Sequence, residues 1–281
     1  MGKGDFMNRE TITIFGSCLN EEKNLPAFLE SNRWADEIII LDSGSTDRSA
    51  EICAQYKNCT VYLQKLEGSF NGRSIFSISK TKTDWCFFSD PDEFITEELR
   101  QEIQIILEND TEYAAFEFPR INFFMDKPLR HGGWSSNGLK MFRRDSVHFE
   151  GDSYHEHPII DGKIGQLKGE VWHYQSPTIH WVLQKFNYIS EFECQEYFNQ
   201  QGMMSERKFK WILFSRPFKI FWKCYIKKKG YKDGLHGLIY AMMIWAFDVI
   251  RMCKYAERYI VKNPNIHSIE ELPDPWKCRK H

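Results

Sequence analysis

The sequence Trp85-Cys86-Phe87-Phe88-Ser89-Asp90-Pro91-Asp92-Glu93 joins a short apolar run to an acidic segment. The apolar run has the length and aromatic content of a buried β-strand, which a proline cannot continue. Asp90 and Asp92 flank that proline, so both carboxylates follow the end of the strand. Carboxylate oxygens are the ligands that Mg²⁺ and Mn²⁺ prefer. The four residues Asp-Pro-Asp-Glu alone would more often form a turn into the next helix, but their position after a buried strand favours a metal site.

Strand-like and helix-like patterns alternate around this stretch, which is typical of βαβ units. Ser45, Thr46 and Asp47 are suited to cap one of the helices, and Thr96 is suited to cap another. We therefore predict an α/β fold with a mostly parallel sheet flanked by helices. The expected strands cover residues 11–15, 37–41, 60–63 and 85–89, and the expected helices cover 25–32, 48–56 and 97–108.

The pattern changes in the second half of the chain. Residues 113–174 contain short apolar or alternating runs separated by turn signals, which predict added strands and loops. Beyond Thr178 the chain is expected to be helical, with breaks at Pro217 and at Lys229-Gly230. We predict a catalytic domain over residues 8–177, a helical region over 178–262 and a tail over 263–281.

Composition bears on where the protein works. The eight cysteines of this 281-residue chain show neither a C-x-x-C pair nor zinc-type spacing, so reduced thiols in the cytoplasm are expected. The first residues lack the long apolar stretch of a signal peptide, and we expect no export.

Charge is distributed unevenly along the chain. Residues 205–262 hold fourteen Lys and Arg against four Asp and Glu, interleaved with aromatic residues such as Trp211, Trp222 and Tyr225. Such a segment can meet an anionic lipid, an anionic glycan or nucleic acid, or it can simply be a solvated helix face. The apolar run over residues 238–247 is shorter than the roughly 20 residues that span a bilayer. We expect peripheral contact with the cytoplasmic, inner face of a membrane, and no nucleic acid partner.

Polar residues follow three of the expected strands at the same end. Asn20 and Glu21 come after the first strand, Asp42 ends the second, and Asp90 and Asp92 follow the fourth. In an open parallel sheet, ligands bind beyond the carboxyl ends of the strands. This convergence is stronger evidence for a ligand site than any one of the motifs.

The same residues carry a family resemblance. Three segments resemble the successive signatures of family 2 glycosyltransferases, and they are Cys18-Leu19-Asn20-Glu21-Glu22, Leu41-Asp42-Ser43-Gly44-Ser45-Thr46-Asp47 and Ser89-Asp90-Pro91-Asp92-Glu93. Five others resemble the bacterial branch that contains lipopolysaccharide core glucosyltransferases, and they are residues 120–124, Arg130-His131-Gly132-Gly133-Trp134, Met141-Phe142-Arg143-Arg144, His155-Glu156 and Trp172-His173-Tyr174. The sequence departs from the family pattern at Ser17, Cys18 and Ser43, where proline, threonine and a second aspartate are usual.

The resemblance implies a GT-A fold, a Rossmann-like nucleotide-diphospho-sugar transferase. It also implies inverting transfer of a sugar from a nucleoside-diphosphate sugar, usually a UDP-hexose, to a lipopolysaccharide core or another surface glycan, with Mg²⁺ or Mn²⁺ as cofactor. In this reading Asp42 receives the uracil or ribose with help from Asn20 and Glu21. Asp90 faces the ribose, Asp92 binds the metal, and Arg73 contacts the diphosphate or base.

Other roles have competing candidates. We expect Glu156 to be the general base, with Asp152 and Glu93 as rivals. His173 can complete the metal shell or be structural. Trp134 can stack on an acceptor sugar or belong to a hydrophobic core. Arg143 and Arg144 can both reach a donor phosphate, and we expect one of them to do so while the other is solvated.

Two other functions compete with glycosyl transfer. A catalytically silent glycan-binding or scaffold protein could keep this fold, but the presence of Asp42, Asp90 and Asp92 together argues against it. A sugar-phosphate nucleotidyltransferase would need a glycine-rich phosphate loop after the first strand, and residues 17–23 do not provide one.

Overall fold

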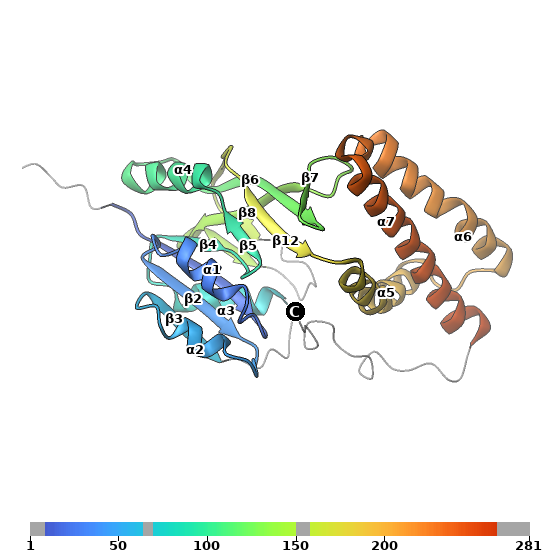
Figure 1. Cartoon of the computed structure of the whole chain (residues 1–281), viewed down its shortest axis with the longest axis horizontal. Coiled ribbons are helices and arrows are strands. Elements are labelled where there is room, and N and C mark those ends of the chain that lie inside the picture. The colour runs from blue at the N-terminus through green and yellow to red at the C-terminus, as the bar shows by residue number, and fades with distance from the viewer. Residues whose placement is uncertain (1–8, 64–69, 150–157, 263–281) are drawn as a thin grey trace, which may run out of the picture. The chain divides into compact units, whose positions relative to one another are not determined.

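The computed structural model describes residues 9–63, 70–149 and 158–262. The chain divides into two compact units, which are described separately. The sheet unit comprises Met1–Arg120 and Ser136–His173, and the helical unit comprises Ile121–Ser135 and Tyr174–Lys280. Figure 1 shows the elements of both units.

Four parallel strands form the first half of the sheet unit, in the order β3-β2-β1-β4. This arrangement confirms the α/β prediction, and the four strands lie within a residue or a few of the expected positions. Their bounds are Ile12–Cys18 for β1, Glu37–Asp42 for β2, Cys59–Leu63 for β3 and Trp85–Phe88 for β4.

Helices cover both faces of this parallel sheet, as the apolar residues on both sides of each strand require. Ile12, Ile14 and Ile38 pack with residues of α1 and α4, whereas Phe15 and Ile39 belong to a second cluster on the other face. Thr96 accepts a hydrogen bond from the Leu99 N–H at the start of α4, which confirms the predicted cap. The helices are α1 (Leu25–Ser31), α2 (Ser49–Cys53), α3 (Phe70–Lys80) and α4 (Glu97–Glu108).

The added strands extend the sheet beyond β4, mainly by antiparallel pairing, in the order β4-β8-β6-β12-β5. β7 pairs antiparallel with β6, β11 pairs parallel with it, and β9 and β10 form a separate two-stranded sheet. Their bounds are β5 (Glu93–Ile95), β6 (Tyr113–Phe124), β7 (Lys127–Leu129), β8 (Ser136–Arg143), β9 (Val147–Phe149), β10 (Pro158–Ile160), β11 (Lys163–Gln166) and β12 (Val171–Ser176).

Three long helices make up most of the helical unit: α5 (Ile179–Gln201), α6 (Glu206–Phe221) and α7 (Gly234–Tyr255). Shorter helical turns are η2 (Trp222–Lys227), η3 (Gly230–Asp233) and η4 (Ala256–Val261). The predicted break at Pro217 is wrong, because α6 continues through this buried proline. Proline within a helix loses one backbone hydrogen bond, whereas burial of its ring favours the folded state. The predicted break at Lys229 is confirmed, since this residue has a left-handed backbone with φ 61°.

The segment Gly230–Val261 is long and apolar enough to cross a membrane by length and composition alone. The expectation that the apolar run over residues 238–247 is too short to span a bilayer is wrong for the whole helical segment that contains the run, because isolated polar residues do not end a helix. Only 22% of the most apolar window in this segment is buried inside the protein.

The packing of β1 against the end of β4 leaves no room for a side chain at Gly16. A Cβ atom placed there would overlap the backbone carbonyl of Ser89. We predict that Gly16→Ala lowers the free energy of unfolding by about 1–3 kcal/mol, as overpacking in a rigid core does. Thermal and urea unfolding followed by circular dichroism would measure the change. Gly138→Ala is the matched control, because its nearest neighbour would lie at an ordinary 3.6 Å; equal stability of the two variants would contradict the close approach.

Candidate functional site

Asp42, at the end of β2, shapes the loop that follows it. Its buried carboxylate accepts hydrogen bonds from the backbone N–H groups of Gly44 at 3.0 Å and Ser45 at 2.8 Å, and from the Ser45 hydroxyl at 2.7 Å. One oxygen, Oδ1, makes all three contacts. The predicted donor-binding carboxylate is therefore held in a fixed orientation by its own loop.

Asn20 and Glu21 connect the loop after β1 to the loop after β2. Asn20 has a left-handed backbone, and its Oδ1 accepts a hydrogen bond from the Thr46 N–H at 2.9 Å. The backbone N–H of Glu21 donates to the Ser49 hydroxyl at 3.0 Å. Two of the predicted site residues thus hold the carboxyl ends of β1 and β2 together.

The predicted cap of the second helix is confirmed for Asp47. Its Oδ1 accepts a hydrogen bond from the Ser49 N–H at 3.0 Å at the start of α2, although the flanking residue Arg48 makes no side-chain contact of this kind. The Ser45 hydroxyl instead accepts the Asn20 N–H at 2.9 Å, and Thr46 donates its N–H to the same asparagine. Ser45 and Thr46 therefore serve the contact between the two loops, which an analysis of local capping could not reveal.

Asp90 and Asp92 lie at the carboxyl end of β4. The Asp90 carboxylate accepts a long hydrogen bond of 3.5 Å from the Ser17 N–H, which connects it to β1. The Asp92 Oδ1 lies 3.6 Å from the Nε2 of His173. The pairing of β5 with β12 explains this approach, because it places His173 directly opposite Glu93.

His173 is buried, with 8% of its surface exposed, and its pKa is lowered. Burial is the largest cause, because it disfavours the charged imidazolium, while the nearby Asp92 carboxylate opposes the shift. The imidazole is therefore neutral at neutral pH and able to bind a metal ion.

The donor set suits Mg²⁺ or Mn²⁺ bound jointly by protein and substrate. Asp92 supplies a carboxylate and His173 an imidazole, which leaves the other positions of the metal to substrate oxygens and water. Within residues 9–63, 70–149 and 158–262, no group of three or more potential protein ligands is preassembled. Asp90 thus does not complete a three-ligand cluster with this pair in the structure.

Glu93 sits at the centre of a buried ion cluster. Its carboxylate contacts the Arg120 Nε at 2.6 Å and the Lys140 Nζ at 2.5 Å, and its side chain is fully buried. Burial alone would raise the pKa of Glu93, but the charges of Lys140 and Arg120 overcome this effect and lower the pKa to about 2. A carboxylate that binds protons this weakly is a poor general base, which counts against Glu93 as a rival to Glu156.

Local sequence patterns do not predict Arg120 and Lys140 as neighbours of the acidic segment. They lie on β6 and β8, 27 and 47 residues from Glu93, and only the order of the strands brings them to it. The available signal was indirect, since an acidic residue at the start of a buried strand requires cationic partners.

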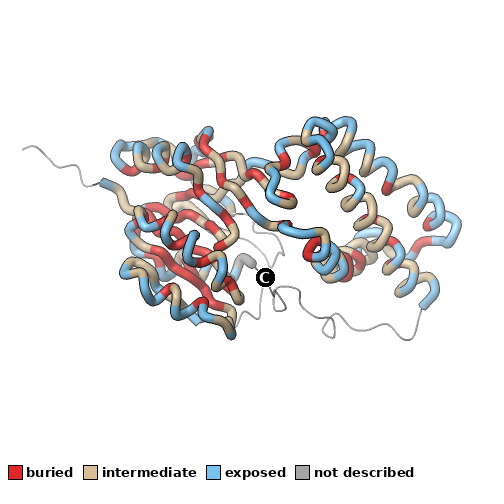
Figure 2. The backbone as a smooth tube through the Cα atoms, in the orientation of Figure 1, coloured by how far each residue is buried: buried red, intermediate tan, exposed pale blue. Residues whose placement is uncertain are grey.

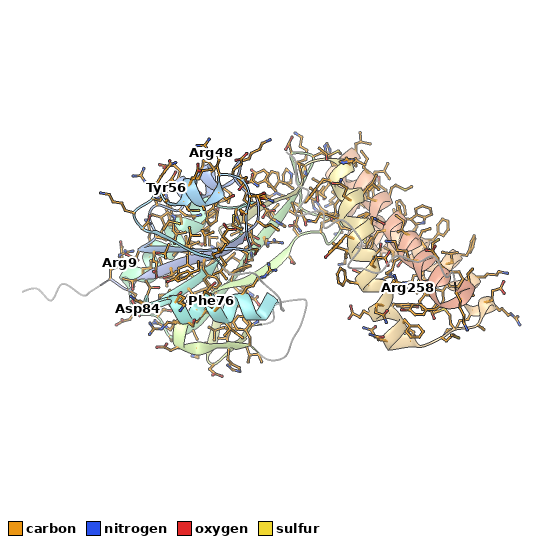
Figure 3. The ribbon with its side chains drawn as sticks, turned by 90° about the horizontal axis from the view of Figure 1, so that it is seen from below. Arg9, Arg48, Tyr56, Phe76, Asp84 and Arg258 are labelled. Atoms are coloured by element: carbon orange, nitrogen blue, oxygen red, sulfur yellow. The ribbon has the colours of Figure 1, made fainter. Side chains whose placement is uncertain are left out.

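The structure does not bring Arg143 to the acidic segment. Arg143 pairs with Glu10 at 2.7 Å and its guanidinium lies 4.5 Å from the centre of the Trp85 ring, at the amino end of β4. Arg9 and Asp84, labelled in Figure 3, belong to this same amino edge, and Asp84 accepts a hydrogen bond from the Thr11 N–H. We therefore leave Arg143 out of the proposed donor site.

The remaining predicted residues lie in three different places. Arg73 is half-buried on α3 of the sheet unit. Trp134 belongs to the helical unit, where it packs edge-on against Tyr240 with ring centres 4.5 Å apart. Glu156 and its rival Asp152 lie outside the described residues.

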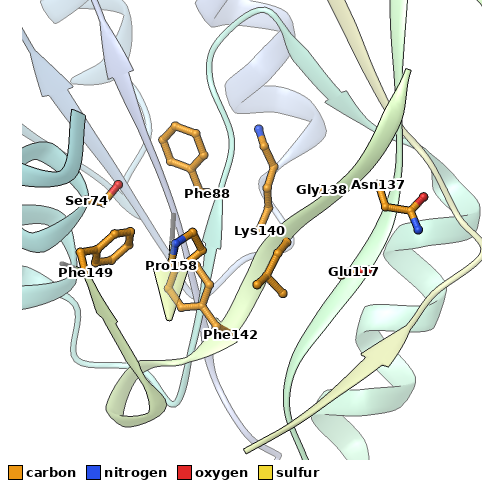
Figure 4. A pocket seen from close by; sticks show the side chains of 10 residues that line it. Ser74, Phe88, Glu117, Asn137, Gly138, Lys140, Phe142, Phe149 and Pro158 are labelled. Carbon is orange, nitrogen blue, oxygen red and sulfur yellow. The ribbon is translucent and has the colours of Figure 1, made fainter. Parts of the chain in front are cut away.

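A cavity of about 390 Å³ lies in the sheet unit, and Figure 4 shows the side chains that line it. Lys140 lines it and also contacts Glu93, and Phe88 lines it two residues before Asp90. The cavity combines aromatic rings with a few hydrogen-bonding groups, which suits a polar ring such as a sugar. Its lining also includes Ser74, Glu117, Asn137, Phe142, Phe149 and Pro158.

The ion cluster predicts a specific pH dependence of stability. We expect Glu93→Gln to lower the free energy of unfolding by about 3 kcal/mol at pH 7, because it removes the buried anion that two partly buried cations face. Because the pKa of Glu93 is about 2 in the folded protein against an ordinary 4.5, this stabilisation is complete above pH 4.5. It is lost as the pH falls from 4.5 to 2, so the difference between the two proteins narrows there.

Urea unfolding at several pH values would measure this difference. Glu97→Gln is the control, because Glu97 pairs with Arg100 at the surface and little effect is expected. A Glu93→Gln protein as stable as wild type at pH 7 would contradict the role of the cluster.

Comparison with known proteins finds relatives among glycosyltransferases. The model of the family described as "Glycosyl transferase family 2" matches residues 13–190. The lipopolysaccharide core biosynthesis glycosyltransferase LpsC of Rhizobium meliloti (strain 1021) is 25% identical over 267 residues, 91% of this chain and 96% of LpsC. An uncharacterized glycosyltransferase of Rickettsia felis is 24% identical over 292 residues, 97% of this chain and 98% of its own length.

A solved structure resembles the fold at low sequence identity. The mannosyltransferase PcManGT from Pyrobaculum calidifontis, in complex with GDP-Man and Mn²⁺, matches with a TM-score of 0.50 and 10% identity, over 92% of this chain and 89% of that one. This likeness concerns the fold alone, and it agrees with the GT-A class predicted from the sequence. With the family model matched over most of the sheet unit, this chain belongs to glycosyl transferase family 2.

Proposed function

We propose that this family 2 glycosyltransferase moves a hexose from a UDP-hexose to a hydroxyl of a lipopolysaccharide core or related surface glycan, with inversion at the transferred carbon. The observation that carries the proposal is the approach of Asp92 and His173 at the carboxyl end of β4, beside the loops fixed by Asn20 and Asp42. The acceptor class rests on the similarity to LpsC. Free thiols at the described cysteines support a reducing, cytoplasmic setting.

We propose that the donor lies across the carboxyl ends of β1, β2 and β4. Asp42 would meet the uracil or ribose, Asp90 the ribose, and Arg73 the diphosphate. Asn20 and Glu21 would act mainly by holding the two loops in place, because the contacts described above already engage them. The donor would thus meet a rigid edge, which reduces the entropy lost on binding.

Asp92 and His173 would hold Mg²⁺ or Mn²⁺ together. The metal, when bound, supplies positive charge that stabilises the departing diphosphate. The Asp92 carboxylate lies 3.6 Å from the neutral imidazole of His173. The two side chains can therefore approach one cation, Asp92 from the segment before β5 and His173 from β12. Glu93 contributes by fixing this segment against β6 and β8.

We propose that the cavity beside Lys140 receives the acceptor sugar and that Glu156 removes the proton from its hydroxyl. Glu156 belongs to the segment that joins Phe149 to Pro158, and both of these residues line the cavity. Glu117 and Asn137 offer hydrogen bonds to sugar hydroxyls, while Phe88 offers a ring. The acceptor oxygen, on losing its proton to Glu156, would attack the anomeric carbon from the face opposite the departing diphosphate, as inversion requires.

Removal of the metal-binding carboxylate tests the metal assignment. We expect Asp92→Asn to lower transfer at least about 100-fold and to abolish Mn²⁺-dependent binding of the donor, with the fold intact. Isothermal titration with UDP-sugars, with and without Mn²⁺, and a transfer assay would measure both effects. Asp145→Asn, at an exposed carboxylate paired with Arg144, is the control. Normal turnover of Asp92→Asn would refute the assignment.

Removal of the base should separate binding from chemistry. We expect Glu156→Gln to keep donor and metal binding but to lose about 10²–10⁴-fold in transfer, the contribution of a positioned proton acceptor. Single-turnover assays would measure transfer, and titration would measure binding. If Asp152→Asn loses transfer while Glu156→Gln transfers normally, Asp152 is the base.

A further inference from the structure

Helix α6 and the first residue of η2 carry a row of exposed aromatic residues, which we call the aromatic stripe. It consists of Trp211, Phe214, Phe218 and Trp222, whose exposed fractions are 67%, 69%, 56% and 63%. Their spacing of three and four residues places all of them on one face of a helix. Large aromatic side chains this exposed are unusual for a surface in contact with water alone.

The opposite face of α6 already packs against its neighbours. Phe209 and Pro217 are buried, and Phe209 belongs to a cluster with Met252 and Tyr255 of α7. Arg216 on this inner side reaches the buried Asp248 of α7 at 3.4 Å. The aromatic stripe is therefore not part of this hydrophobic core of the helical unit.

The apolar surface continues from α6 onto α7. The Phe218 ring lies 6.2 Å from that of Trp245, and Leu235 and Met242 on α7 are 66% and 48% exposed. In Figure 2 the helices α6 and α7 are mostly tan and pale blue, in contrast to the red strands of the sheet unit. The two helices thus share an exposed apolar surface, and α7 belongs to the segment whose most apolar window is only 22% buried.

Cations border the aromatic stripe. Residues 206–233 hold ten Lys and Arg against two acidic residues. On the helical wheel of α6, exposed Lys208 and Lys219 lie on one flank of the stripe and exposed Lys210 on the other. An apolar centre with a cationic border matches a bilayer surface, where anionic headgroups surround accessible acyl chains.

We propose that the aromatic stripe and its lysines bind the surface of an anionic bilayer, with α6 lying in the interface. This goes beyond glycosyl transfer and does not depend on it. Trp211 and Trp222 would reach the boundary between headgroups and acyl chains, where tryptophan is favoured. The lysines would meet the lipid phosphates.

The ion pairs of α7 favour surface contact over a crossing helix. Asp248 pairs with Arg216 and Arg251, and Lys254 pairs with Glu191 of α5 at 2.7 Å. A membrane crossing by α7 would either break these pairs or carry the charges of α5 and α6 into the hydrocarbon, and both are costly. Contact through one face of α6 leaves every pair intact.

Vesicle flotation tests the proposal with the full-length protein. Vesicles of phosphatidylcholine with 30% phosphatidylglycerol would be compared with pure phosphatidylcholine, at low and high salt. We expect binding to the anionic vesicles, weakened but not abolished by salt. The variant Trp211→Ser/Phe214→Ser/Trp222→Ser should bind at least about 10-fold less. Its control is Met203→Ser/Val261→Ser, which removes two exposed apolar side chains of the helical unit outside the stripe.

Charge reversal tests whether vesicle binding depends on the lysines near the aromatic stripe or only on the net charge of the protein. We expect Lys208→Glu/Lys219→Glu/Lys223→Glu to lose binding, whereas reversal of three exposed lysines of the sheet unit, Lys57, Lys82 and Lys168, should retain most of it. Circular dichroism would confirm that each variant is folded. Equal binding by the stripe variant and wild type, or equal loss in both charge-reversed proteins, would overturn the proposal. Either result would leave the proposed glycosyltransferase function unaffected.

Discussion

The buried carboxylate of Glu93 fixes the segment on which the site depends. A charged group with no exposed surface is tolerated only with close partners, and Arg120 and Lys140 provide them from β6 and β8. Because Asp90 and Asp92 immediately precede Glu93, the cluster also fixes where their backbone leaves β4. The pairing of β5 with β12 then brings His173 to Asp92. One ion cluster thus connects the antiparallel half of the sheet to the end of the parallel half.

Polar contacts among the loops complete the same edge. Asp42 organises its own loop through three hydrogen bonds to one oxygen, and Asn20 attaches that loop to the one after β1. The absence of a side chain at Gly16 lets the Ser89 carbonyl approach β1 closely. Asp42 and Asn20, which the sequence suggests as ligand-binding residues, therefore also hold the loops of the protein in place. The loops so fixed present a preorganised surface to a nucleotide sugar.

The sequence contained enough local information to predict the parallel strands, the Thr96 cap and the acidic segment after Trp85 to Phe88. Each of these depends on residues close together in the chain. The partners of Glu93 were not predictable in this way, because strand order brings them together over 27 and 47 residues. The position of Arg143 was not predictable for the same reason. The pairing of β8 with β4 sets Arg143 opposite Trp85, at the amino end of β4. The spacing of the aromatic stripe is visible in the sequence, but which face of α6 packs inward is decided by α7.

The central claim is that the carboxyl ends of β1, β2 and β4 bind a nucleoside-diphosphate sugar through a divalent metal at Asp92. A crystal structure of the protein with UDP and Mn²⁺ tests it most directly. The account predicts the diphosphate beside Asp92, with Mn²⁺ bound to this carboxylate and to phosphate oxygens, and the uracil near Asp42. UDP bound at another place, or Mn²⁺ bound without Asp92, would contradict it.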